Sequence, residues 1–235
     1  MSKLSTVGFN PPPDFPVDKY NKVRACLNRY KETQNIQWAL FGLGWNGLAY
    51  RYRAMDEYDN QFTTSIKEFG NSPPFEERYN QGKALFGFFV NAVSVFECFF
   101  FSTYFIASIL KPEQFPLSKS ELEFYPSNVK KGYIANFNNS SLSNAIERCL
   151  KQSTYWEINN VRRVLLHRGM PPRRFYRGGE RDGMATMPIN PDAPSDQWQF
   201  DFQIDTSTTS LYRQWVGETI NELVMASNDF CGKYL

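Results

Sequence analysis

Apolar residues recur every three or four positions over much of this chain, the spacing that places them on one face of an α-helix. One helix is predicted over residues 48–69, and a longer one from Glu76 to Leu110, which Lys111–Pro112 ends. A shorter helix is predicted over residues 17–33. Residues 35–47 are apolar but contain three glycines, so we expect this stretch to be either extended or a broken helix.

Serine and threonine residues ahead of apolar runs predict three further helix starts. These helices are expected from Ser141 or Ser143 to Leu150, over residues 154–167, and from residue 207 or 208 onward. Residues 197–204 alternate apolar and polar side chains, which predicts a strand beside a small hairpin turned at Asp182–Gly183.

The predicted fold class is all-α, with a short β insertion before the last helix. Residues 1–16 are rich in proline and are predicted to form a flexible arm. Residues 17–235 are predicted to be a single domain, in which residues 17–79 supply N-terminal helices and residues 80–235 form the core.

Composition sets limits on this fold and its partners. The chain has 235 residues, of which 42% are hydrophobic, enough for a substantial core. A net charge of +2 excludes a uniformly basic coat for nucleic acid but allows a local basic patch. The four cysteines are 72, 51 and 82 residues apart, which fits neither metal-ligand nor redox spacing, so we expect reduced structural thiols. The first residues lack the apolar core of a signal peptide, and a cytoplasmic location is expected.

A long apolar segment covers residues 84–110, with Glu97 as its only charge. It is long enough to cross a membrane, so a membrane-anchored protein is one interpretation. A central acid costs roughly 2.5–3.5 kcal/mol on insertion, however, and several polar residues interrupt the segment. We therefore favour the core helix of a helical domain and expect no membrane partner.

Candidate chemistry gathers around the single histidine, His167. The window from 162 to 181 contains seven arginines and one acidic residue, a local net charge of +6. The guanidinium group binds phosphate through two parallel hydrogen bonds, so this window is a candidate phosphate-binding region. Its arginines are Arg162, Arg163, Arg168, Arg173, Arg174, Arg177 and Arg181. With one histidine and dispersed cysteines, no metal site or cofactor is expected.

The segment Arg162-Arg163-Val164-Leu165-Leu166-His167 resembles the motif of the HEPN superfamily: an arginine, four residues, then a histidine near the end of a helix. The wider segment WEINNVRRVLLHRG at 156–169 is similar to that of many bacterial HEPN proteins. The long apolar helix upstream also suits the family's four- to five-helix bundle. The resemblance implies a HEPN-like fold over about residues 80–235.

The resemblance implies metal-independent RNA cleavage, in a toxin-like endoribonuclease. His167 would exchange protons with the attacking 2′-hydroxyl, and Arg162 would stabilise charge on the phosphoryl oxygens. Arg163, Arg168, Arg173, Arg174 and Arg177 would bind RNA phosphates, and Asn159 would support the site. Arg162 and His167 point about 140° apart on an ideal helix. The family's solution, a site shared by two protomers, implies a homodimer, and an antitoxin is a possible further partner.

The alternative function is a non-catalytic module that binds RNA, nucleotide or protein. The position after the motif arginine is usually Asn, Asp or His in this family, and here it is Arg163. That departure favours binding without cleavage. Glu97 is a further supporting residue. As a lone acid in an apolar helix it is expected to pair with Arg162, Arg163 or His167, or else to face solvent.

Overall fold

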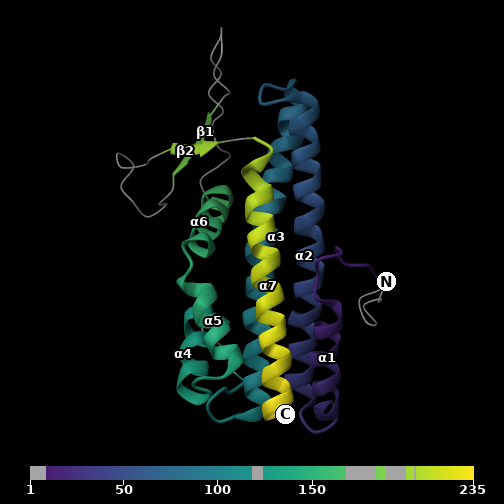
Figure 1. Cartoon of the computed structure of the whole chain (residues 1–235), viewed down its shortest axis with the longest axis vertical. Coiled ribbons are helices and arrows are strands. Elements are labelled where there is room, and N and C mark those ends of the chain that lie inside the picture. The colour runs from purple at the N-terminus through teal and green to yellow at the C-terminus, as the bar shows by residue number, and fades with distance from the viewer. Residues whose placement is uncertain (1–8, 118–123, 168–183, 189–199, 204) are drawn as a thin grey trace. The chain divides into compact units, whose positions relative to one another are not determined.

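A computed structural model describes residues 9–117, 124–167, 184–188, 200–203 and 205–235 (Figure 1). These residues are mainly helical, which confirms the all-α prediction in its coarse form. The elements in chain order are α1 (Val17–Leu27), η1 (Asn28–Tyr30), α2 (Asn35–Phe69), α3 (Phe75–Leu110), α4 (Pro126–Asn136), α5 (Ser141–Lys151), α6 (Ser153–His167), β1 (Met184–Pro188), β2 (Phe200–Gln203) and α7 (Ser207–Tyr234).

The two strands pair antiparallel, with Met184 opposite Gln203 and Ala185 opposite Phe202. β2 lies inside the range predicted for a strand. The connecting residues 189–199 and the predicted turn Asp182–Gly183 lie outside the described residues. A β insertion with its hairpin therefore stays a prediction.

The helix boundaries follow local chemistry. The Ser140 hydroxyl accepts a hydrogen bond from the Ser143 backbone N–H at 3.1 Å, so the cap of α5 is Ser140, ahead of both predicted positions. The described part of α6 runs from Ser153 to His167, in agreement with the helix predicted over residues 154–167. α1 is shorter than predicted, because it gives way to η1 after Leu27.

The chain divides into two compact units. The first comprises Met1–Arg53, Ser94–Gln152 and Gly217–Leu235, and the second comprises Ala54–Val93 and Ser153–Val216. α2, α3 and α7 each contribute residues to both units. The single domain expected over residues 17–235, with N-terminal helices in 17–79 and the core in 80–235, stays a prediction.

The first unit is built around a buried aromatic pair, Tyr20 of α1 and Trp45 of α2. Their rings stack with centroids 5.0 Å apart. The Tyr20 hydroxyl donates to the Trp45 carbonyl at 2.7 Å, and the Trp45 indole N–H donates to the Tyr20 carbonyl at 3.2 Å. Each ring therefore buries its apolar body while its polar atom has a backbone partner.

Part of the proline-rich segment, predicted to be a flexible arm over residues 1–16, packs within the first unit. Pro12 is buried, and Phe15 is only 4% exposed. The Phe15 ring lies 5.1 Å from that of Tyr52, whose hydroxyl donates to the Asp14 carboxylate at 2.7 Å. One aromatic anchor and one charged hydrogen bond thus hold this segment in the first unit.

α2 is continuous through residues 35–47, so the prediction of an extended or broken stretch was wrong. The glycines serve close packing instead of a turn. A Cβ atom at Gly44 would lie 2.5 Å from the Ser102 hydroxyl oxygen and 3.1 Å from the Cys98 carbonyl oxygen of α3. At Gly47 it would lie 2.9 Å from the Cys98 sulfur. These positions lack side chains because α3 occupies the space.

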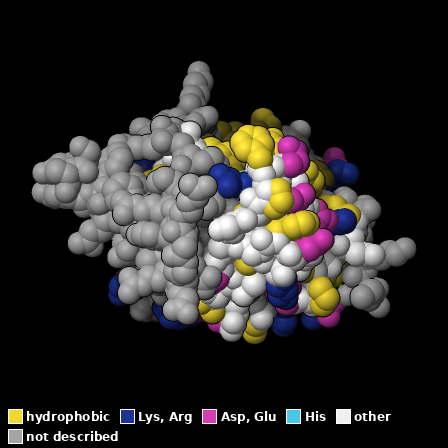
Figure 2. All heavy atoms as spheres, turned by 90° about the horizontal axis from the view of Figure 1, so that it is seen from above, with side chains coloured by type: hydrophobic (Ala, Val, Ile, Leu, Met, Phe, Trp, Pro, Cys, Tyr) yellow, Lys and Arg dark blue, Asp and Glu magenta, His cyan; other side chains and the backbone are white. Residues whose placement is uncertain are grey.

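The second unit contains the turn between α2 and α3. Gln81 is fully buried, and its amide donates to the carbonyls of Ser65 at 3.3 Å and Gly70 at 3.1 Å, which fastens the turn to α3. Phe75 and Tyr79 just beyond the turn are 82% and 62% exposed. Figure 2 shows hydrophobic side chains interspersed with acidic and basic ones on the described part of its face.

α3 is long and apolar enough to cross a membrane by length and composition. Within the protein, however, 67% of its most apolar 18-residue stretch is buried. This is the behaviour of a core helix in a helical domain, the alternative that the sequence favoured.

We predict that Gly44→Ala lowers the free energy of unfolding by about 1–3 kcal/mol, because the added methyl group overpacks the contact with α3. The matched control is Gly42→Ala on the same helix, where a Cβ meets no atom within 4 Å. That variant should be stabilised by about 0.5–1 kcal/mol, since alanine favours a helix over glycine. Urea unfolding followed by circular dichroism measures both, and equal effects would contradict close packing at Gly44.

Candidate functional site

The sequence-predicted site lies on α6, in the second unit. Asn159, Arg162 and Arg163 are all half-buried on this helix. The Nε atom of Arg162 is buried, so its side chain lies along the edge of the buried face instead of extending fully into solvent. His167 is the last residue of α6. The His167 side chain and the residues Arg168, Arg173, Arg174 and Arg177 lie outside the described residues.

The core-facing side of α6 explains the position of these polar residues. Tyr155, Ile158 and Leu165 are buried at helical spacing, while Trp156 and Leu166 are 47% and 40% exposed. The buried residues hold α6 in the unit, and Trp156 and Leu166 lie on its exposed side. Among the residues that the structure describes, no three His, Cys, Asp or Glu side chains gather to hold a metal ion.

Glu97 belongs to α3 in the first unit, and its side chain is exposed. Its carboxylate accepts a hydrogen bond from the Ser94 hydroxyl at 3.3 Å. An exposed carboxylate needs no buried counter-charge. The reason for expecting a partner in Arg162, Arg163 or His167 therefore does not hold, although the pairing itself is not tested.

Sequence reasoning missed a cluster of charged groups in the second unit. Arg213 of α7 is only 9% exposed, and its Nε and Nη2 atoms lie 2.9 and 2.8 Å from one oxygen of Asp56 on α2. Asp59 lies one turn further along α2, beside the buried Thr209. Two carboxylates thus share one largely buried guanidinium group.

Burial raises the pKa of the Asp59 carboxyl above its ordinary value. The neighbouring Thr209 hydroxyl and the charge of Arg213 lower this pKa, and the charge of Asp56 raises it. The folded protein therefore holds this proton to higher pH than the unfolded chain. The associated stability is complete below the ordinary pKa of 3.8 and is lost as pH rises through the folded-state value.

A signal for this cluster exists in the sequence. Asp59 falls in the core-facing register of α2, between the buried residues Met55 and Phe62. An acid at such a position needs a nearby cation. That cation is Arg213, which pairs with Asp56, 157 residues away in the chain, and whose charge also acts on Asp59. Periodicity along α2 identifies the core-facing position of Asp59. It does not identify Arg213 as the nearby cation, because the pairing of distant helices is a tertiary property.

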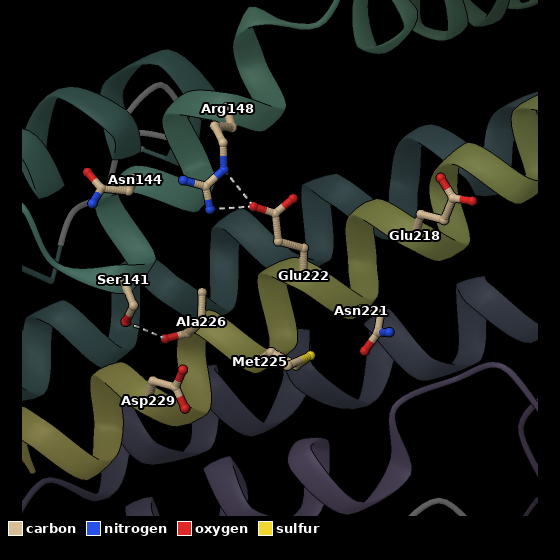
Figure 3. Close-up of a pocket in the computed structure, with 9 residues that line it drawn as sticks. All are labelled: Ser141, Asn144, Arg148, Glu218, Asn221, Glu222, Met225, Ala226 and Asp229. Carbon is tan, nitrogen blue, oxygen red and sulfur yellow. Dashed lines mark hydrogen bonds and ion pairs between the residues drawn. The ribbon is translucent and has the colours of Figure 1, made fainter.

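The first unit contains a groove of about 400 Å³ between α5 and α7 (Figure 3). At one wall, Arg148 of α5 donates from both Nε and Nη2 to the same oxygen of Glu222 on α7, the Nε bond being 2.7 Å. The Ser141 hydroxyl donates to the Ala226 carbonyl at 3.1 Å. These contacts connect α5 to α7 and define the sides of the groove.

The residues that line the groove are suited to binding a ligand more than to catalysing a reaction. The Glu218 and Asp229 carboxylates and the Asn221 amide line it, with Met225 as its exposed apolar residue. A second groove of about 560 Å³, between residues 10–19 and α7, shares Asn221 and Met225. This arrangement suits polar or positively charged groups, but it contains none of the residues predicted from the sequence.

We predict that Arg213→Met lowers the free energy of unfolding at pH 7 by about 2–4 kcal/mol, because two carboxylates lose a buried cation. The loss should shrink at pH 4, where Asp59, whose pKa is raised by burial, takes up a proton and no longer repels Asp56. Asp59→Asn is the matched variant in the same cluster and should leave stability at pH 7 unchanged or higher. Urea unfolding at both pH values measures this, and a pH-independent loss would contradict the electrostatic interpretation.

Comparison with known proteins yields no relative for this chain: no family model matches it, and no curated protein and no solved structure does.

Proposed function

We propose that this protein is a metal-independent endoribonuclease of HEPN type, with a HEPN-like helical bundle and a short β insertion before α7. The observation that supports the proposal is that α6 is continuous from Ser153 to His167. The motif arginine and histidine therefore belong to one rigid helix, at its C-terminal end, next to the arginine-rich window.

Helix geometry then determines how such a site would be completed. Five residues of α-helix rise about 7.5 Å and rotate the side chain direction by about 140°. Arg162 and His167 of one chain therefore do not share a face of α6. A second copy would supply the missing group, so we propose a homodimer in which each site combines Arg162 of one protomer with His167 of its partner.

The chemistry needs one proton acceptor and one cation. His167 takes the proton of the ribose 2′-hydroxyl, whose oxygen attacks the adjacent phosphorus. Arg162 stabilises the negative charge on the phosphoryl oxygens, and the 5′-oxygen leaves with a proton. The products carry a 2′,3′-cyclic phosphate and a 5′-hydroxyl. Arg163, Arg168, Arg173, Arg174 and Arg177 hold the phosphates on either side.

The second candidate is a non-catalytic module that binds RNA or nucleotide through the same arginines. Arg163 favours it, because a second arginine beside the motif arginine adds phosphate affinity without adding a proton acceptor. In either form we expect the protein to act in the cytoplasm, with an antitoxin as a possible partner of the nuclease.

We predict that the full chain cleaves mixed cellular RNA in EDTA, and that Arg162→Ala and His167→Ala each reduce the rate at least about 100-fold. Leu166→Ala, at an exposed position of α6 beside His167, is the control that should retain activity. Mixing the two inactive variants should restore part of the activity, since a hybrid dimer regains one complete site. Cleavage by all variants alike would contradict the proposal.

If the chain binds RNA without cleaving it, affinity should fall steeply with salt, because bound phosphates release counterions. Arg163→Ala should then lower the slope of log affinity against log salt by about one. Fluorescence anisotropy with a short single-stranded RNA measures the slope. A flat salt response would contradict both RNA functions.

A further inference from the structure

Two of the four cysteines come together in the first unit, although they are 205 residues apart in the chain. Cys26 lies near the end of α1, and Cys231 lies near the end of α7. The Cys26 thiol donates to the Cys231 backbone carbonyl, with the sulfur 3.8 Å from the oxygen. The spacing along the sequence contains no sign of this pairing.

The two thiols differ in accessibility. Cys26 is partly exposed, whereas Cys231 is only 1% exposed. Burial raises the pKa of the Cys231 thiol, the neighbouring Cys26 thiol raises it further, and Arg29 lowers it. A dissolved oxidant therefore reaches Cys26 first, with Cys231 behind it.

A cation is positioned at the accessible sulfur. The Nη2 atom of Arg29, one turn after Cys26, donates to the Cys26 sulfur at 3.5 Å. This positive charge lies beside the sulfur that would attack a peroxide, and it stabilises negative charge there. The guanidinium group is exposed, so it leaves the sulfur accessible to solvent.

The other two cysteines provide a comparison within the same chain. Burial raises the pKa of the Cys149 thiol to about 12, and the charge of Glu222 adds to the effect. Burial also dominates at Cys98, where it raises the pKa of the thiol. Burial of this kind makes a thiol inert, and Cys149 fits the structural role that the sequence predicted for all four cysteines.

We propose that Cys26 and Cys231 are a peroxide-responsive pair that closes into a disulfide. The Cys26 thiolate attacks one oxygen of hydrogen peroxide, breaking the O–O bond, and becomes a sulfenic acid while hydroxide leaves and takes a proton. The Cys231 sulfur then loses its proton and attacks the Cys26 sulfur, and the S–O bond breaks to release water. Peroxide is reduced by two electrons, which the two sulfurs supply.

The bond would connect the end of α1 to the last turns of α7. It would close a loop of 205 residues, so the oxidised chain should be more stable than the reduced one. In a reducing compartment such a bond is transient, which suits a response to oxidant more than a permanent link. The proposal does not depend on the RNA chemistry of α6.

The test treats the reduced full-length chain with equimolar hydrogen peroxide, blocks free thiols, and maps the peptides by mass spectrometry without reductant. The expected product is one peptide pair joined through Cys26 and Cys231, two hydrogens lighter than its parts, with a higher melting temperature. Cys98→Ser and Cys149→Ser should leave this product unchanged. Arg29→Gln should slow its formation about tenfold, because the cation beside the Cys26 sulfur is lost.

Cys231→Ser separates the two steps. This variant should accumulate the Cys26 sulfenic acid, which dimedone traps, and should show no rise in melting temperature. Three results would overturn the proposal: over-oxidation of Cys26 with Cys231 still free in the wild type, a disulfide to another cysteine, or no change at Cys26 after peroxide treatment.

Discussion

Part of α3 is buried around its whole circumference, and the neighbouring helices cover it there. Residues 102–109 are all buried, more than two helical turns in succession. A polar group buried in such a helix either forms a hydrogen bond within the helix or lowers the stability of the fold. Asn91, Ser102 and Thr103 each donate to the carbonyl four residues earlier, at 2.7, 2.8 and 3.1 Å. The polar residues that interrupt the apolar run thus need no external partner.

The helices that pack against α3 contain residues that suit this close packing. α2 brings its backbone close to α3 at Gly44, where a side chain would collide with Ser102. Tyr133 of α4 is fully buried, and its hydroxyl donates to the Thr103 carbonyl of α3 at 2.7 Å. Aromatic rings fill volume while their polar atoms bond to backbone, so an interior rich in tyrosine retains few unsatisfied groups.

Charged and reactive groups lie at partly buried positions in each unit. Asp56, Asp59 and Arg213 lie at the partly buried boundary of the second unit, where a carboxylate is neither fully hydrated nor fully enclosed. Cys26 lies at a helix end of the first unit, accessible on one side and in contact with Cys231 on the other. Both clusters join segments that are distant in sequence, and we expect the stability of the protein to respond to pH at the first cluster and to oxidant at the second.

The sequence by itself determined the helical class, the extent of α3 and α6, and the position of Arg162 and His167 on one helix, because local periodicity and capping depend on neighbours within a few residues. The prediction for residues 35–47 was wrong. Glycine by itself indicates a break in a helix, and its role in close packing becomes apparent only when α3 lies beside it. Only the tertiary structure decided that Phe15 anchors the proline-rich arm, that Arg213 faces Asp56, and that Cys26 meets Cys231. These contacts join residues far apart in the chain, and no local pattern encodes which distant helices will pack together.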